Sequence, residues 1–423
     1  MVKKYIPRIV DDILAFKLES KGAVWIRGPK WCGKSTTAAK FAKTVIYMQD
    51  EASKKQNIAL AKISPEDFLK GDTPVLIDEW QTIPFIWNQI RLEVDRRDDF
   101  GQFILTGSNQ PEDLENLDKH SGTGRITTLM MRPMSLFESG ESDGSVSLKE
   151  LFDGKPIVTK RSDKTLLDYA YYTARGGWPK AIGQNEAVAL EQAIDYVDGI
   201  INTDMSEDGV KRDPDRVRLL LRSYARNCSS MANYSTIKND VIANDVMSLD
   251  EDTIANYIKA LKRLYVVEES EAWNPNLRSK TAIRTSNTRY FVDPSLACAA
   301  LDVGPEGLIA DLKLFGLLFE NLCVRDLRIY ADPLKGKVKH YRDSSNLEVD
   351  AVITLNNGKW AAVEVKLGSD EFIEEGAQNL LKLVDKLDPR ATKPSFLMVL
   401  TGTKMAYRRE DGVLVVPIGC LRP

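Results

Sequence analysis

The sequence predicts an α/β protein that begins with a parallel β-sheet covered by helices. Over the first ~140 residues, short apolar or β-branched runs alternate with helical patterns, which is typical of buried parallel strands. A mainly helical region follows between about residues 165 and 265, and mixed α/β patterns return in the last ~120 residues. The strands expected in the first part are at 23–28, 44–50, 74–80 and 101–109.

We expect three domains, because 423 residues at roughly 150 residues per domain allow two to four. The parallel sheet is assigned to 1–160, a helical domain to 161–302 and a second α/β domain to 303–423. A polar stretch at 138–145 is expected to form a linker or a surface loop.

Composition excludes several classes of protein. With 58 Lys and Arg against 61 Asp and Glu, the net charge of −3 argues against a strongly basic nucleic-acid coat. No apolar run approaches ~18–20 residues, so no membrane span is expected. Pro7, Arg8 and an acidic pair interrupt the first apolar stretch, which is unlike a signal peptide. Five scattered cysteines and two histidines suit neither a disulfide framework nor a zinc site, and they favour a cytoplasmic location.

The segment GPKWCGKS at 28–35 matches the phosphate-binding pattern GxxxxGK[ST], between an expected strand and an expected helix. Its glycines let backbone N–H groups curl around phosphates, and the helix N-terminus adds partial positive charge. We therefore predict binding of ATP and Mg²⁺, with Lys34 on the β- and γ-phosphates and the Ser35 hydroxyl on the metal. An ordinary glycine-rich turn is the alternative. The expected nucleotide contacts are Gly28, Pro29, Lys30, Trp31, Cys32, Gly33, Lys34, Ser35 and Thr36.

An apolar strand ending in two carboxylates, VLIDE at 75–79, provides the second half of this site. Open α/β sheets bind ligands at the carboxyl ends of their strands, where Asp78 is expected. Asp78 would hold Mg²⁺ through its water shell, and Glu79 would act as the base toward the attacking water. The alternative is an acidic strand end that faces solvent.

Two further groups are candidates for the same reaction. Ser108 or Asn109, after the strand at 103–106, would sense the γ-phosphate or align the water, unless it only caps a loop. Arg125 or Arg132 would supply a cationic finger to a neighbouring copy, unless it forms an ordinary surface ion pair.

Six motifs, GPKWCGKS, VLIDEWQTIP, ILTGSN, SGTGRI, RPMSLFE and RGGWP, occur in this order along the chain. In content and order they resemble a widespread group of prokaryotic AAA+-type P-loop ATPases. Members of that group carry a C-terminal domain of unknown function, which looks like a winged helix followed by a restriction-endonuclease-like fold. The resemblance covers essentially the whole chain and is specific in its first half.

The resemblance also implies residue roles. Lys34 and Ser35 would contact phosphate and Mg²⁺, Asp78 and Glu79 metal and water, with Asn109 as sensor and Arg125 as finger. The chain departs from the group at Trp31-Cys32, where members tend to carry a basic or polar residue and then Val. A reactive thiol at a helix N-terminus would be one reason, although we favour a filler without a chemical role.

The helical middle holds two features that bear on nucleic acid. Arg218, Arg222 and Arg226 share one helix face, either as a phosphate-facing stripe or, with acidic residues nearby, as the solvated face that we favour. Helices near 234–237 and 250–261 predict a helix-turn-helix followed by a wing, which would dock either DNA or a protein. Its outward residues would be Asn256, Lys259, Lys262 and Arg263, with Arg278, Lys280 and Arg284 near the wing tip.

The segments 348–355 and 359–366 flank Asn356-Asn357-Gly358, which predicts a β-hairpin with Gly358 in the left-handed conformation. A three-residue loop places Asp350 opposite Glu364, and Glu348 opposite Lys366, on one face. A two-residue loop would place Asp350 opposite Val365 instead and disperse these acids.

Clustered carboxylates repel one another unless a cation or a proton lies between them. Two carboxylates and a lysine can bind Mg²⁺ and assist water in attacking a phosphodiester. The set Asp350, Glu364 and Lys366 resembles the Asp…Glu-x-Lys signature of restriction-endonuclease-like nucleases. Glu320 matches an acid on the first helix of that fold.

The sequence thus predicts an Mg-dependent ATPase with nucleic-acid-binding effector domains. A nucleotide-gated switch that binds a protein partner, with an inactive nuclease-like domain, remains the alternative. A small-molecule kinase is a weaker third hypothesis. A homo-oligomer is expected if Arg125 acts as an arginine finger on a neighbouring copy of the chain.

Overall fold

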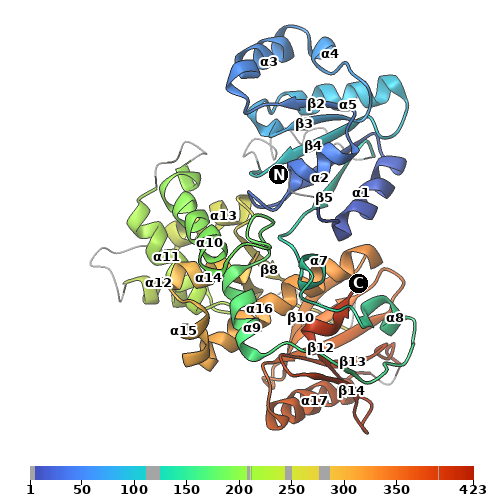
Figure 1. Cartoon of the computed structure of the whole chain (residues 1–423), viewed down its shortest axis with the longest axis vertical. Coiled ribbons are helices and arrows are strands. Elements are labelled where there is room, and N and C mark those ends of the chain that lie inside the picture. The colour runs from blue at the N-terminus through green and yellow to red at the C-terminus, as the bar shows by residue number, and fades with distance from the viewer. Residues whose placement is uncertain are drawn as a thin grey trace. The chain divides into compact units, whose positions relative to one another are not determined.

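The computed structural model describes residues 5–110, 124–206, 210, 212–242, 250–275, 286–388 and 390–423 (Figure 1). The chain forms two compact units. The first contains residues 1–133 with the short segments 206–210 and 260–265, and the second contains the remainder. The main segment of the first compact unit ends at Pro133, and the domain boundary expected at residue 160 stays a prediction. A division of the remainder near residue 302 stays a prediction.

The first unit is built on a parallel sheet of five strands among its described residues, in the order β2-β3-β4-β1-β5. All four strands that the sequence predicted are present, and β5 is an addition. The strands are β1 (Ala23–Arg27), β2 (Thr44–Tyr47), β3 (Val75–Asp78), β4 (Phe103–Gly107) and β5 (Ile126–Met130). The helices are α1 (Ile9–Ser20), α2 (Lys34–Phe41), α3 (Glu51–Ile63), α4 (Pro65–Phe68), η1 (Trp80–Thr82) and α5 (Ile86–Arg97).

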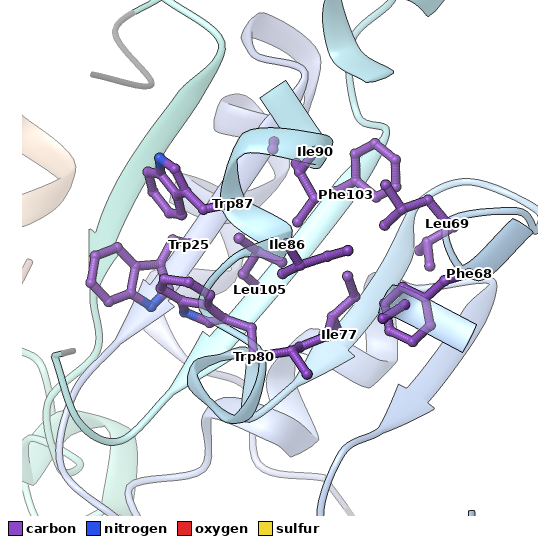
Figure 2. Packing of buried hydrophobic residues seen from close by; sticks show 14 of the residues in the cluster. Trp25, Phe68, Leu69, Ile77, Trp80, Ile86, Trp87, Ile90, Phe103 and Leu105 are labelled. Carbon is purple, nitrogen blue, oxygen red and sulfur yellow. The ribbon is translucent and has the colours of Figure 1, made fainter. Parts of the chain in front are cut away.

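Residue alternation along the strands divides the core of the first unit into two layers. Trp25, Ile77 and Phe103 face one side, where they pack against Trp87 and Ile90 of α5 (Figure 2). The intervening strand residues are also fully buried, because α2 covers β1, β3 and β4. Burial on both faces explains why these strands are continuously apolar in the sequence.

The second unit contains a mixed sheet in the order β10-β11-β12-β13-β15-β14-β7. Its strands are β7 (Lys160–Arg161), β10 (Lys337–Arg342), β11 (Glu348–Thr354), β12 (Trp360–Lys366), β13 (Leu397–Thr401), β14 (Met405–Arg408) and β15 (Leu414–Pro417). The helix α17 (Asp370–Asp385) packs on one face through Ile373, Ala377 and Leu380. The long helix α16 (Leu312–Ala331) contacts β10, β11 and β12.

The rest of the second unit is mainly helical. Its helices are α7 (Leu136–Ser139), α8 (Leu148–Phe152), α9 (Leu166–Arg175), α10 (Glu186–Asn202), η3 (Asp204–Ser206), α11 (Pro214–Arg226), α12 (Tyr234–Ile242), α13 (Glu251–Arg263), α14 (Pro294–Leu301), α15 (Pro305–Ala310), η5 (Asp332–Leu334) and η6 (Ile418–Cys420). Two strand pairs accompany them, β6 (Val146–Ser147) with β16 (Leu421–Arg422), and β8 (Val267–Ser270) with β9 (Thr288–Phe291).

Two sequence motifs, RPMSLFE and RGGWP, meet inside this unit rather than at a ligand site. The Met134 N–H donates to the Gly177 carbonyl at 2.7 Å, and a Cβ on Gly177 would lie 2.0 Å from the Met134 carbonyl oxygen. The close approach of the Met134 and Gly177 backbones requires glycine at 177, so we assign these motifs a structural role.

A buried ion-pair cluster also lies in this unit. Arg325, fully buried on α16, pairs with Asp293 and Asp326 at 2.7 Å.

Candidate functional sites

The loop between β1 and α2 has the backbone shape that a phosphate cradle needs. Gly28 and Gly33 have φ angles of 154° and 103°, and Trp31 is left-handed at 64°. A Cβ on Gly28 would lie 2.1 Å from the Met131 carbonyl oxygen, so only glycine fits. The loop therefore wraps around the N-terminus of α2 and presents backbone amides there, as phosphate binding requires.

Lys34, the first residue of α2, is 4% exposed, and its Nζ donates to the Pro29 carbonyl at 2.7 Å. The ammonium group thus bridges the loop at its centre, where a bound phosphate would compete with a neutral carbonyl for it. Ser35 is half-buried, and Thr36 is exposed at the start of the helix. The residues present fit a nucleotide phosphate.

Trp31 and Cys32 differ in their environments. The Trp31 side chain is 45% exposed, whereas Cys32 is fully buried and its Sγ donates to the Met131 carbonyl at 3.4 Å. The burial of Cys32 agrees with the role of filler that we favoured.

Arg8 is a residue of this site that the sequence pattern did not indicate. Its guanidinium is 7% exposed and donates through Nη1 to the Cys32 carbonyl and through Nη2 to the Arg132 carbonyl, both at 2.8 Å. It joins the loop to the segment after β5. An isolated arginine ahead of the first helix carries no pattern, so only the three-dimensional contact reveals it.

The acidic pair lies at the carboxyl end of β3, the same sheet edge as the loop after β1, since the strands are parallel. Thr106 Oγ1 of β4 donates to Asp78 Oδ1 at 2.5 Å. Glu79 has a left-handed φ of 57°, which turns the chain out of the strand. Its Oε2 accepts hydrogen bonds from Ser108 Oγ at 2.9 Å and from Gln81 Nε2. Asp78 and Glu79 thus stand where a metal and an attacking water would be needed.

Asn109 follows Ser108 beyond β4 and is half-buried. Its Oδ1 is buried without a hydrogen-bond partner among the described residues. Ser108 therefore contacts the acidic pair directly, and Asn109 is the next residue along the chain.

Arg125 does not lie at this edge. The Ala23 N–H, at the amino end of β1, donates to the Arg125 carbonyl at 3.0 Å. The side chain is 46% exposed and pairs with Asp95 at 2.7 Å. Since β1 is five residues long, Arg125 is roughly 13 Å along the strand from the phosphate loop. It therefore cannot complete the phosphate site of its own chain.

The predicted hairpin is present in the second unit with the predicted three-residue loop. Ala351 pairs with Val363 and Thr354 with Trp360, and Gly358 is left-handed at a φ of 84°. The Val365 N–H donates to Asp350 Oδ2 at 2.7 Å, so at this point the acceptor is a side-chain oxygen and not a backbone carbonyl of β11. Glu348 forms an ion pair with Arg342 of β10 at 2.7 Å, and its predicted position opposite Lys366 follows the observed register.

The four residues of the nuclease-like signature converge at the end of this hairpin. Lys366 Nζ lies 3.1 Å from Glu364 Oε2, and Tyr290 of β9 donates to Glu320 Oε1 at 2.6 Å. Burial, and then the charge of Asp350, raise the pKa of both Glu320 and Glu364 well above the ordinary value. Burial likewise raises the pKa of Asp350, and the carboxylates raise that of Lys366 against the opposing effect of burial.

Glu320 and Asp350 open into a cavity of about 280 Å³, lined also by Ser229, Thr288, Tyr290 and Arg342. Within the described residues, no group of three or more His, Cys, Asp or Glu side chains has the arrangement of a metal site. Mg²⁺ commonly keeps several waters and uses one or two carboxylates, which Asp350 and Glu364 could provide.

The region in which a helix-turn-helix was predicted is only partly described. Asn256 and Lys259 of α13 are exposed as predicted, while Ile254, Ile258 and Leu261 are fully buried. Arg263 is half-buried and its Nε donates to the Gln110 carbonyl at 3.2 Å, so it does not face outward as we expected. Arg278, Lys280 and Arg284 lie outside the described residues. On α11, Arg222 and Arg226 pair with Asp302 and Asp240, in agreement with a solvated face.

No helix in the described ranges combines the length and apolar character needed to cross a membrane. All five cysteines are buried and free, and burial raises the pKa of Cys228 to about 12.

Three family models match separate parts of the chain. Residues 20–139 match the AAA domain, 166–307 match a domain of unknown function (DUF8612), and 315–421 match another (DUF4143). Among curated proteins, the chain is 22% identical over 361 residues to an uncharacterized protein of Mycobacterium tuberculosis and to one of Mycobacterium bovis. These alignments cover 85% of this chain and 73% of each relative.

Two solved structures are also similar. A Walker-type ATPase of Pyrococcus abyssi shares 16% identity, with a TM-score of 0.44, over 71% of this chain and 97% of that one. The Orc1 protein of Aeropyrum pernix in complex with DNA shares 14% identity, with a TM-score of 0.23, over 74% and 97%. The AAA match coincides with the sheet that carries the phosphate loop and the acidic pair, and it supports nucleotide binding there.

Proposed function

We propose that the first unit binds Mg-ATP and hydrolyses it. The observation that carries this proposal is that the loop before α2 and the pair Asp78-Glu79 share one edge of a parallel sheet. The strand between them, β4, supplies Thr106 to Asp78, and Ser108, just beyond its end, donates to Glu79. A phosphate cradle beside paired carboxylates is the arrangement that phosphoryl transfer to water needs.

Each group has a defined task in this proposal. Backbone amides of residues 28–36 hold the phosphates, and Lys34 exchanges the Pro29 carbonyl for phosphate oxygens. Ser35 and Asp78 would hold Mg²⁺, which neutralises charge on the phosphates when bound. Glu79 accepts a proton from the attacking water, and Ser108 with Asn109 orients that water.

Phosphate release by the purified chain tests the proposal. Lys34→Ala should lower the rate by at least roughly a hundredfold, because it removes charge that stabilises the transition state. Lys43→Ala, an exposed lysine just beyond α2, is the matched control and should leave the rate unchanged. Equal rates in the wild type and Lys34→Ala would contradict the proposal.

We also propose that the second unit has a metal-dependent phosphodiester site within a nuclease-like domain at 303–423, next to a winged helix in 161–302. The convergence of Glu320, Asp350, Glu364 and Lys366 favours it. Asp350 and Glu364 would hold Mg²⁺, and Lys366 would orient the attacking water or stabilise charge at the phosphate. Nucleic acid is the substrate class that this chemistry implies.

A cleavage and gel-shift assay with Mg²⁺, with and without ATP, tests this second site. Glu364→Ala should abolish cleavage of single- or double-stranded DNA, and Glu371→Ala, exposed on α17, should not. If Glu364→Ala leaves every nucleic-acid-linked activity intact, the unit is instead a binding module that ATP gates toward a partner.

A further inference from the structure

Three buried polar atoms of the first unit lie close around Gly107, at the carboxyl end of β4. A Cβ placed on Gly107 would lie 2.8 Å from Gln81 Oε1 and 3.3 Å from each of Trp25 Nε1 and Trp80 Nε1. All three atoms are buried and have no hydrogen-bond partner in the described part of the chain. Figure 2 shows the indole nitrogens of Trp25 and Trp80 together, while that of Trp87 points away.

The orientation of the Gln81 amide is fixed by its other end. Gln81 Nε2 donates to Glu79 Oε2, and a carboxylate oxygen cannot donate in return, so the amide nitrogen must lie on that side. The amide oxygen therefore lies on the Gly107 side, where the two indole nitrogens also lie. A side chain on residue 107 would crowd all three atoms, so their arrangement depends on glycine there.

The hydrogen-bonding character of the three atoms indicates what could join them. Two N–H donors and one carbonyl acceptor match a water molecule, which would accept two hydrogen bonds and donate one here. Trp80 is fully buried and Trp25 is 2% exposed, so these atoms are shielded from bulk solvent. The indole rings of Trp25 and Trp80 pack edge to face, with their centroids 5.5 Å apart.

We propose that one buried water molecule joins Trp25, Trp80 and Gln81, and that Gln81 thereby acts as the positioning residue for Glu79. This inference rests on the proposed ATP hydrolysis, in which Glu79 takes the proton of the attacking water. Gln81 and Ser108 both donate to Glu79 Oε2 and hold the carboxylate from one side. Without the water, the Gln81 oxygen would have no buried partner and the amide would turn away.

Steady-state kinetics tests the positioning role. Gln81→Ala and Gly107→Ala should each lower kcat about tenfold or more, while the KM for ATP stays within about twofold, because neither residue belongs to the phosphate loop. The Gly107 φ lies outside the left-handed region, so Gly107→Ala acts through the contacts of the added Cβ, the closest of which is with the Gln81 amide oxygen.

A double-mutant cycle separates this role from general damage. Gly107→Ala should have no further effect in the Gln81→Ala background, since both act through the same amide. An equal effect of Gly107→Ala in both backgrounds would overturn the inference. Gln56→Ala, exposed on α3, and Gly199→Ala, with open space around it on α10, are matched controls that should retain wild-type kcat.

The water itself is tested without ATP hydrolysis. The seven tryptophans, labelled with ¹⁵N at the indole, should give two signals with cross-peaks to a long-lived water. Gly107→Ala should remove both cross-peaks, and Trp87→Phe should remove neither. Absence of the cross-peaks in the wild type would overturn the water site. A wild type without ATPase activity would overturn the proposed function instead, and thermal unfolding of every variant checks its fold.

Discussion

Arg8 shows how a single side chain can hold a phosphate loop in place before any ligand binds. Its two hydrogen bonds, to the carbonyls of Cys32 and Arg132, join two segments that flank the loop. The segment before it is also anchored, because Tyr5 donates to Asp11 at 2.6 Å and lies 3.0 Å from Thr37 Oγ1 of α2. A loop that is already ordered loses less entropy when it binds a nucleotide.

We therefore expect Arg8→Ala to weaken ATP binding. Loss of two charge-assisted hydrogen bonds at about 1.5 kcal/mol each corresponds to a rise in Kd of up to roughly a hundredfold. Calorimetric titration with a non-hydrolysable ATP analogue measures this change. Arg218→Ala, exposed on α11, serves as the control, and unchanged affinity in Arg8→Ala would show that the loop keeps its shape unaided.

At the scale of elements, the hairpin of β11 and β12 and the helix α16 bring buried carboxylates together at a cost in stability. The folded-state pKa of Glu320 lies well above its ordinary value, because of burial and the charge of Asp350. A carboxyl group with a raised folded-state pKa makes its full contribution to the free energy of unfolding at pH values below its unfolded pKa of about 4.3. That contribution to stability is lost as the pH rises toward the folded-state pKa.

Replacement of Glu320 by its neutral isostere should therefore stabilise the chain at high pH. Glu320→Gln keeps an acceptor for Tyr290 and removes the buried charge. We expect its Tm to exceed that of the wild type at pH 9 in EDTA, and the difference to shrink at pH 5. Each unit of pKa difference corresponds to about 1.4 kcal/mol. A difference in Tm that does not vary with pH would contradict this expectation.

The elements also show what sequence patterns can and cannot predict. The register of the hairpin was predictable because Asn356, Asn357 and Gly358 determine it locally. The strand before Asp78 was predictable from its apolar run. Tyr290 as the donor to Glu320, and Gln81 as the donor to Glu79, depend on packing between segments or on one side-chain rotamer, which leave no periodic signal. The ion pair of Glu348 with Arg342 was not predictable, because it depends on β10, a strand that the hairpin pattern does not indicate.

At the scale of the whole molecule, the position of Arg125 bears on assembly. It lies at the sheet edge opposite the phosphate loop and pairs with the exposed Asp95, so its own chain cannot use it as a finger. A second copy of the chain could use it, and we propose this arrangement. Removal of such an arginine lowers ATP hydrolysis by roughly a thousandfold or more in comparable enzymes.

Mixing of two inactive variants tests that arrangement. Arg125→Ala retains the phosphate loop and Lys34→Ala retains the arginine, so a mixed assembly contains sites with both. We expect the mixture to recover ATPase activity well above the sum of the separate variants. A mixture with no more than that sum would exclude a finger at Arg125 in trans.

The burial of all five cysteines has a practical consequence for studies of motion in the intact chain. Because a maleimide reacts with an accessible thiolate, the native thiols should stay silent toward dye attachment under native conditions. Single cysteines introduced on exposed helices could then carry a fluorophore pair without any change to the wild-type background. Energy transfer between the pair would report in real time how the two units respond when nucleotide is added.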